Sequence, residues 1–247
     1  MQWSFNQDTD CDVDAPEAWD IETGNEDVII AVLDTGVEIN HSDISDNIWI
    51  NSDEIGDNGI DDDNNGFVDD VNGWNFAYGG INDVWDNQGH GTHCAGVIGA
   101  VGNNNKGVAG LCWNCKIMPV RVLPDGPMPI HILAEGVFYA IENGARVISM
   151  SLGIYGYSRY LEDLFYYADS KGVICIASAG NDDTYEVQYP SGYEEVISVA
   201  ATDQNDERAF FSNYGSSVDI AAPGVEIYSL DNYNSSVSYT HLTLPTN

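Results

Sequence analysis

Short continuous runs of apolar residues recur along the chain and predict buried β-strands. The clearest runs lie at residues 28–33 and 173–177. Runs of this kind, without polar alternation, are typical of parallel strands that are covered on both faces. Between them, residues 132–141 show the apolar spacing of a helix that packs on a sheet. The pattern predicts an α/β fold with a mainly parallel central sheet and helices on both faces.

The two apolar runs lead to side chains that can take part in chemistry. Asp34 directly follows the first run, and Asn181 follows the second after a Ser-Ala-Gly segment. In an open parallel sheet the functional crevice lies at the carboxyl ends of the strands, so we expect both residues there. Taken alone, Asp34 would be interpreted as a turn residue that bonds its own backbone, and Asn181 as a capping residue.

A histidine between two glycines marks the start of a further buried helix. His90 follows Gly89 and precedes Gly91, and the small and apolar residues 94–100 come next. This order predicts a tight turn that opens into a helix lying close to the sheet, with the imidazole in the cleft. A lone histidine is usually structural, but here it accompanies an aspartate and an asparagine at predicted strand ends.

Together these three stretches resemble the subtilisin-like serine proteases, or subtilases. The resemblance implies a subtilisin-like three-layer fold and hydrolysis of peptide bonds through an acyl-enzyme. It implies that Asp34 orients His90, that His90 exchanges the proton of the serine, and that Asn181 donates to the oxyanion. It also implies that the substrate adds as a strand to an edge and contacts Ser151, Leu152, Gly153, Ser178, Ala179 and Gly180.

The resemblance covers residues 1–230, which we expect to form an incomplete catalytic domain. Subtilases carry Gly-Thr-Ser-Met-Ala shortly after this point, with the serine opening a helix. In residues 231–247, Ser235, Ser236 and Ser238 lack both the preceding glycine and the small helical run. We therefore expect the catalytic serine to be missing through truncation, this chain to be inactive, the tail to pack weakly from Asp231, and the His90 helix to be partly exposed. The alternative is a non-catalytic, calcium-bound protein that keeps the fold.

An acidic loop at residues 61–70 has the pattern D-x-D-x-N-G, which offers oxygen ligands at alternate positions. Calcium takes six to eight oxygens, often from one such loop. The loop is no EF-hand, since the twelfth position from Asp61 is Asn72, and a solvated acidic loop is the alternative. We predict calcium ligands at Asp61, Asp63, Asn65 and Asp69 or Asp70. The family resemblance implies a further calcium site that includes Asp43 and Asn104.

The net charge of the chain limits the classes of partner that it can bind. The chain has 40 acidic and 7 basic residues, a net charge of −33, which excludes a nucleic-acid-binding surface. No apolar run is long enough to cross a bilayer. The 247 residues suffice for one core, and the first residues do not resemble a secretion leader. We expect a secreted, monomeric enzyme, represented here by its mature form, that acts on proteins or peptides.

Five cysteines cannot all form pairs with one another. Cys112 and Cys115 form a C-x-x-C motif that leads into a predicted strand at residues 116–122. Zinc is disfavoured because no second cysteine pair or ligating histidine lies nearby, and a redox role would favour the motif at the start of a helix. A short-range disulfide and two free thiols both remain open. We expect Cys94 to be a small buried hydrophobic residue.

Overall fold

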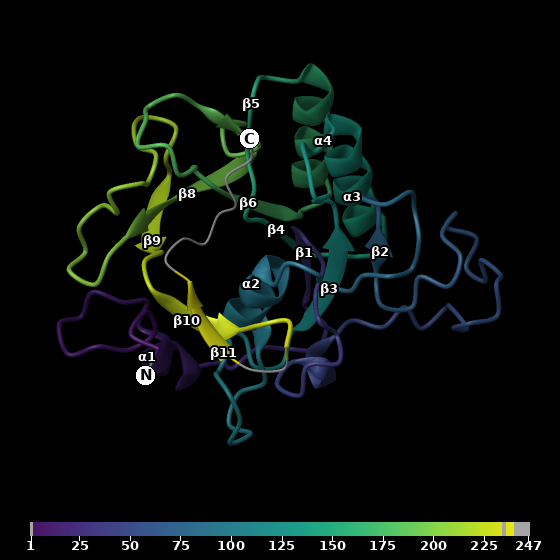
Figure 1. Cartoon of the computed structure of the whole chain (residues 1–247), viewed down its shortest axis with the longest axis horizontal. Coiled ribbons are helices and arrows are strands. Elements are labelled where there is room, and N and C mark those ends of the chain that lie inside the picture. Colours follow the sequence, from purple (N-terminus) through teal and green to yellow (C-terminus); the bar gives the residue numbers. More distant parts are fainter. Residues whose placement is uncertain (1, 234–235, 240–247) are drawn as a thin grey trace.

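The computed structural model describes residues 2–233 and 236–239, and a seven-stranded sheet lies at its centre (Figure 1). Every pair of neighbouring strands in this sheet is parallel. In spatial order the strands are β2 (Trp74–Asn75), β3 (Lys116–Arg121), β1 (Ile29–Asp34), β4 (Val147–Met150), β6 (Ile174–Ser178), β8 (Val196–Thr202) and β9 (Ile220–Pro223). The predicted parallel sheet is confirmed.

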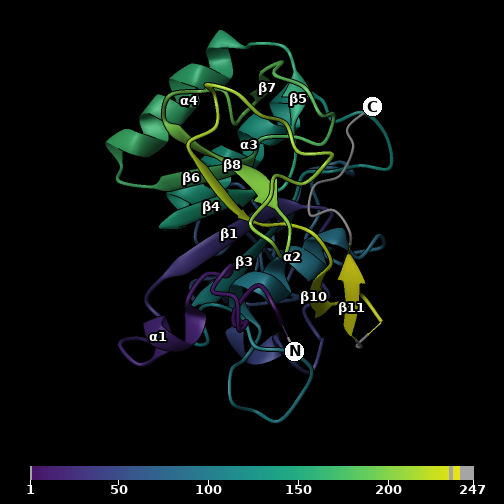
Figure 2. The same cartoon turned by 90° about the vertical axis from the view of Figure 1, so that its left-hand side faces the viewer.

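Helices cover both faces of the sheet, as the sequence predicts (Figure 2). α3 (Ile130–Glu142) and α4 (Arg159–Ser170) lie on one face, and α2 (His90–Gly99) lies on the other. A short helix, α1 (Ala15–Trp19), and one 3-10 turn (Ser45–Asn47) precede them. The result is the three-layer α/β architecture expected from the resemblance.

The side chains of β1 explain why its sequence is apolar throughout. Ala31 and Leu33 belong to the larger core, which α3 and α4 share, whereas Val32 belongs to a smaller core with Ala95 of α2. Because successive side chains of a strand point to opposite faces, a strand covered twice needs apolar residues at every position. Burying one such aliphatic side chain contributes roughly 1.5–3 kcal/mol, so both layers stabilise β1.

Two small antiparallel sheets flank the central one. β5 (Ile154–Tyr155) pairs with β7 (Gln188–Tyr189), and β10 (Ile227–Leu230) pairs with β11 (Ser236–Tyr239). β10 lies against α2, where the Ser229 hydroxyl donates to the carbonyl of His93 at 2.8 Å. Nε2 of His93 donates to the carbonyl of Ile227 at 3.1 Å. The expectation that the His90 helix would be partly exposed is therefore wrong, because β10 covers it.

Residues 231 and 232 are still packed against the fold. Asp231 and Asn232 are both buried, and the Asn232 amide donates to the carbonyl of Asp86 at 3.0 Å. The expected weak packing from Asp231 is wrong at these two residues. Ser236 and Ser238 lie in β11, which is a strand and not the start of a helix. Ser235 and residues 240–247 lie outside the described residues.

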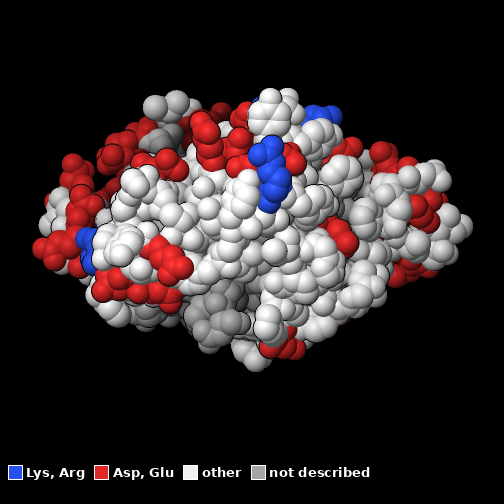
Figure 3. Space-filling view, turned by 90° about the horizontal axis from the view of Figure 1, so that it is seen from above, with Lys and Arg blue, Asp and Glu red and all other residues white. Residues whose placement is uncertain are grey.

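Carboxylates make up most of the charged groups on the surface. Figure 3 shows them along much of the rim of one face, where basic side chains are few. Within the described part of the chain, the ion pairs of arginine and lysine are those of Arg159 with Glu162 and Asp163, and of Arg208 with Asp183. Exposed pairs of this kind contribute at most about 1 kcal/mol each to stability. Most of the acidic charge therefore has to be screened by ions from the solvent. None of the described helices is long and apolar enough to cross a membrane.

Candidate active site

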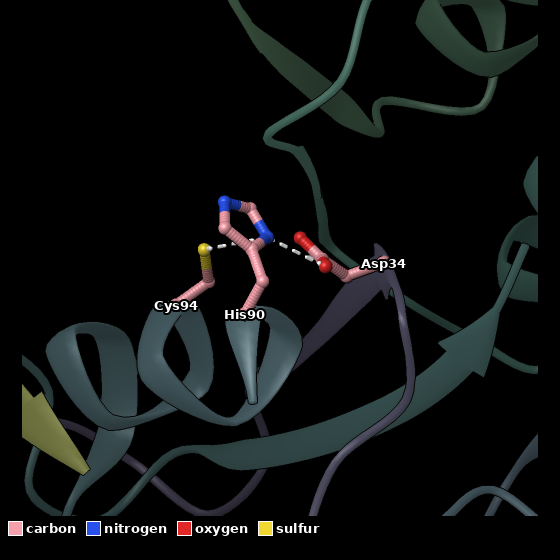
Figure 4. A group of neighbouring side chains, drawn as sticks. All are labelled: Asp34, His90 and Cys94. Atoms are coloured by element: carbon pink, nitrogen blue, oxygen red, sulfur yellow. Dashed lines mark hydrogen bonds and ion pairs between the residues drawn. The ribbon is translucent and has the colours of Figure 1, made fainter. Parts of the chain in front are cut away.

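Asp34 and His90 meet at the carboxyl end of β1 (Figure 4). Asp34 is the last residue of β1, and His90 is the first residue of α2. Oδ1 of Asp34 lies 2.7 Å from Nδ1 of His90, and both side chains are almost fully buried. A carboxylate at Nδ1 places the ring proton there and leaves Nε2 as the proton-accepting nitrogen. The structure thus brings the two predicted residues into contact, and their catalytic roles stay a prediction.

Glycine at position 91 makes the close approach of α2 to β1 possible. A side chain there would place its Cβ 2.1 Å from the carbonyl oxygen of Gly36 and 3.0 Å from Cβ of Asp34. Neither backbone could yield by that much without moving the strand end. The glycines around His90 therefore set the distance between imidazole and carboxylate, in addition to forming the turn.

Asp86 anchors the start of α2 and was not found by sequence reasoning. Its carboxylate is fully buried and accepts from the backbone N–H groups of Gln88, Gly89 and Thr92 at 2.8–3.0 Å. It also accepts from the hydroxyl of Thr92 at 2.7 Å. These bonds satisfy N–H groups at the helix start, and the negative charge interacts favourably with the helix dipole. Asp86 is thus a positioning residue for His90.

Thr35 connects this anchor to the strand that carries Asp34. Its hydroxyl donates to Oδ1 of Asp86 at 2.9 Å and accepts from the backbone N–H of Gly91 at 2.9 Å. The backbone N–H of Thr35 donates to Oδ1 of Asp34 at 2.7 Å. The only signal for this network in the sequence is the proximity of Thr35 to Asp34 and of Asp86 to His90.

Two opposing effects set the protonation of His90. Burial is the largest single effect and disfavours the charged ring, but the charges of Asp34 and Cys94 and their hydrogen bonds to the ring together outweigh it. The pKa of His90 is therefore raised well above its ordinary value. A base of this kind, held by a carboxylate, can accept a proton and stabilise the resulting imidazolium.

Cys94 lies one helical turn beyond His90 and is buried, as expected for a small hydrophobic residue. Its Sγ lies 3.9 Å from Nδ1 of His90, and Figure 4 shows it on the other side of the ring from Asp34. The thiol contacts the nitrogen that Asp34 already holds. Cys94 therefore packs against the acid–base pair and does not replace either member.

Asn181 lies at the same edge of the sheet, after β6, and its turn is fixed by a residue distant in sequence. Asn213 is buried, and its amide donates to the carbonyl of Ala179 at 3.0 Å while its Oδ1 accepts from the backbone N–H of Asp182 at 2.9 Å. Gly180 has a φ of 112°, which glycine adopts without strain. Asn213 is a second positioning residue that the sequence pattern did not indicate.

A cavity of about 200 Å³ lies at the carboxyl ends of β4, β6, β8 and β9. Ser151, Ser178, Gly180 and Asn181 line it, so four of the predicted site residues meet there. The Leu152 side chain is fully buried in the larger core, which leaves only its backbone for the predicted substrate contact. Gly153 and Gly180 both lie against the side chain of Gln188, whose Oε1 would be 2.5 Å from a Cβ at either position.

The acidic loop brings part of the predicted calcium set together. Oxygen atoms of Glu54, Asp63 and Asp70 lie within 4.8 Å of one another. Asp70 is fully buried, and this burial raises its pKa, while hydrogen bonds from Tyr139, Asn65 and Asn51 oppose the rise. Converging carboxylates beside amide side chains fit the oxygen-rich coordination of calcium. Glu54, which precedes the loop, is a candidate that the motif did not include.

The remaining acidic residues of the predicted set fold the loop itself. Asp61 accepts from the backbone N–H groups of Asn65 and Gly66 at 3.0 and 2.9 Å. Asp69 accepts from Asn58 and Gly59 in the same way. Asp61 and Asp69 therefore act on the backbone, whereas Asp63, Asn65 and Asp70 point to the shared cluster.

Asp43 and Asn104 are also in contact. The Asn104 amide donates to Oδ1 of Asp43 at 2.6 Å, and the backbone N–H of Val108 donates to Oδ2 at 2.8 Å. Asp43 is buried, and His41 accepts its backbone N–H at 3.1 Å. The amide nitrogen of Asn104 faces Asp43 here, so Asn104 would have to turn its oxygen to this carboxylate to complete the oxygen ligands that calcium prefers. His41 has a structural role here.

A parallel three-layer α/β fold with a buried aspartate–histidine pair at its strand ends defines the class of subtilisin-like serine proteases. The sequence model of the subtilase family matches residues 25–247, and the chain belongs to that family. Because the match extends to residue 247, the boundary expected at residue 230 stays a prediction.

Three relatives show the range of the similarity. Thermitase of Thermoactinomyces vulgaris is 40% identical over 220 residues, which cover 88% of this chain and 70% of thermitase. A thermophilic serine proteinase of Bacillus sp. (strain AK1) is 37% identical over 213 residues, or 86% of this chain and 47% of that protein. A cell wall-associated protease of Bacillus subtilis (strain 168) is 39% identical over 205 residues, which cover 83% of this chain and 20% of that protein. The chain thus spans less than half of the latter two.

Proposed function

We propose that Asp34, His90 and Asn181 are the acid–base and oxyanion-binding groups of a serine endopeptidase that acts on proteins or peptides. The buried contact of 2.7 Å between Asp34 and His90 is the observation that carries this proposal. Asp34 holds the imidazole in the tautomer whose Nε2 accepts the serine proton and returns it to the leaving amine. Asn181 would donate to the oxyanion, where a donor acts on charge that forms only during the reaction.

We further propose that none of Ser235, Ser236 and Ser238 is the serine nucleophile. Ser236 and Ser238 lie in a strand, and Ser235 shares their lack of the family motif. The acid–base pair is expected to act once a serine-bearing helix is provided. Secretion and a monomeric state are part of the same proposal, and the cell wall-associated relative supports an extracellular location.

A chimera tests whether the Asp34–His90 pair is catalytic. Residues 1–230 would be joined to the C-terminal segment of a subtilase that contains Gly-Thr-Ser-Met-Ala. The chimera is expected to hydrolyse casein, and His90→Ala is expected to abolish this because no other group can accept the serine proton. His131→Ala is the matched control, since His131 is exposed on α3. A folded chimera without activity would favour the non-catalytic alternative, and activity that survives His90→Ala would refute the assigned role.

We propose that Glu54, Asp63 and Asp70, with the side-chain oxygens of Asn51 and Asn65, hold one calcium ion in the acidic loop. Calcium would supply positive charge where Asp70 is fully buried and the carboxylates repel one another. We propose a second calcium site that includes Asp43 and Asn104. Asn51 and Asn65 each donate to both Asp63 and Asp70, so these amides would rotate to present oxygen when calcium binds.

Calcium is expected to raise the melting temperature of the chain. An ion bound only by the native state at 100 times its Kd adds about 2.7 kcal/mol. At about 2–4 °C per kcal/mol for a chain of this size, that is roughly 5–10 °C. Calorimetry with calcium and with chelator measures the shift.

Variants separate specific binding from general charge screening. Asp63→Ala is expected to reduce the calcium-dependent shift, whereas Asp53→Ala, in an exposed position beside Glu54, is expected to keep it. Equal melting curves with calcium and with chelator would refute the calcium proposal. If both variants lost the calcium-dependent shift in melting temperature equally, calcium would act only by screening charge.

A further inference from the structure

The C-x-x-C segment is held rigidly against the far end of the His90 helix. The backbone N–H groups of Leu111 and Cys112 donate to the carbonyls of Val97 and Ile98, both at 2.9 Å. On its other side, the backbone N–H of Trp113 donates to the carbonyl of Thr23 at 2.7 Å. The turn is therefore held by two other segments of the fold, the end of α2 and the segment before β1.

The two thiols differ in exposure and in partners. Cys115 is fully buried in the smaller core, whereas Cys112 is half-buried at its edge. Sγ of Cys115 donates to the carbonyl of Cys112 at 3.4 Å. A Cβ at Gly24 would lie 2.4 Å from Sγ of Cys112, so glycine is needed for this approach. Cys112 is thus the more accessible thiol, and Cys115 is enclosed by the core.

Hydrogen-bond donors converge on the sulfur of Cys112. The thiol of Cys115 is the main one and lowers the pKa of Cys112 to about 6, although partial burial opposes this. The backbone N–H groups of Cys115, Asn114 and Asn25 contribute in the same direction. These donors stabilise the thiolate, as the N-terminus of a helix does in redox-active C-x-x-C motifs. The side-chain interaction with Cys112 is the main cause that raises the pKa of Cys115, followed by burial.

Charged groups around the turn come from three segments. Lys116 begins β3, Glu22 and Glu26 lie on the segment before β1, and Asp46 lies in the 3-10 turn, and all four line one hollow with Trp113 and Asn114. Lys116 lowers the pKa of Cys115, which opposes the effect of burial.

We propose that Cys112 and Cys115 form a reversible dithiol–disulfide site, in which Cys112 attacks and Cys115 resolves. This site is independent of peptide hydrolysis. The Cys112 thiolate attacks one sulfur of a small disulfide such as oxidised glutathione, whose S–S bond breaks and releases one thiolate. Cys115 then loses its proton to solvent and attacks the Cys112 sulfur of the mixed disulfide. The Cys112–Cys115 bond forms, a second thiolate leaves, and two electrons have passed to the small disulfide.

The disulfide reagent dithiobis(nitrobenzoate) tests the order of attack in the full chain carrying Cys11→Ser, which removes the other partly exposed thiol. At pH 6.5, a fast phase is expected to release two thionitrobenzoates per chain. With Cys115→Ser added, one is expected and the adduct should persist. With Cys112→Ser added, release is expected to slow by roughly tenfold or more, because the low pKa is lost. Cys175→Ser, at a buried position in β6, is the matched control, and this variant should still release two thionitrobenzoates in the fast phase.

A mapping experiment needs no substitution at either cysteine of the site. After treatment of the Cys11→Ser chain with oxidised glutathione, peptide mapping is expected to find Cys112 linked to Cys115. Linkage through Cys94 or Cys175, or a stable glutathione adduct on Cys112, would overturn the proposal. So would a fast phase that survives Cys112→Ser in a chain whose circular dichroism shows that it is folded.

Discussion

Fluorophosphonate probes are expected to leave the purified chain unlabelled, and casein hydrolysis is expected to stay at background. His90 can activate a nucleophile only if that group is held within hydrogen-bond reach. The backbone from Ser236 to Tyr239 forms a strand that pairs with β10, which is not the helix start that presents serine in subtilases. In subtilisin itself, a member of this family, loss of the serine lowers turnover by about 10⁶.

Mass spectrometry after labelling decides this prediction. The chimera that contains Gly-Thr-Ser-Met-Ala is the positive control and should be labelled stoichiometrically. If peptide mapping of the original chain finds stoichiometric label on Ser235, Ser236 or Ser238, a nucleophile is present and the interpretation of residues 231–247 is wrong.

Replacing Asp34 with Asn is expected to have the second-largest effect. Asn keeps an oxygen for the backbone N–H of Thr35 but removes the charge that raises the pKa of His90. Burial then dominates, so the pKa of His90 should fall, which NMR titration of the ring protons can follow. In the active chimera, turnover should fall by about 10⁴, the loss found for the same change in a Ser-His-Asp protease.

The same substitution gives a signed pH dependence of stability. Because the folded-state pKa of His90 lies above the ordinary 6.5 of an unfolded histidine, protonation stabilises the native chain. This contribution is complete below pH 6.5 and is lost as the pH rises through the raised pKa. The stability difference between wild type and Asp34→Asn should therefore be largest in acid and shrink in alkali.

Denaturant unfolding at several pH values measures this difference. Asp43→Asn is the matched control, since Asp43 is also buried and bonds to Asn104, not to His90. An Asp34→Asn chain with an unchanged His90 pKa would refute the assigned pairing.

The sequence pattern alone predicted those features that depend on a single segment of the chain. The continuous apolar run before Asp34 predicts a strand covered twice, because a strand with a solvated face would alternate. Asp34 and Asn181 follow apolar runs, and the carboxyl ends of parallel strands meet at one edge, so their common location follows from topology alone. Gly89 and the small residues after His90 predict a helix that lies close to the sheet.

Contacts between distant segments could only be found in the tertiary structure. Asp86 supports His90 because its carboxylate reaches the N–H group of Thr92 in α2, two N–H groups just before α2, and the Thr35 hydroxyl, an arrangement that no spacing specifies. β10 covers α2 because Gly96 leaves room for Ser229 and Leu230, which lie more than a hundred residues later.

For the acidic loop and the C-x-x-C turn as well, the sequence indicated the motif and the tertiary structure decided the roles of its residues. The D-x-D-x-N-G motif indicated a cation-binding loop, but all its carboxylates look alike in sequence. Folding separates Asp61 and Asp69, which bond backbone, from Asp63 and Asp70, which meet Glu54. The thiol pair was visible as a motif, whereas its asymmetry arises from burial of Cys115 and from donors on other segments. Sequence determined which groups are present, and packing decided which of them face one another, because burial and hydrogen bonding depend on neighbours brought from elsewhere in the chain.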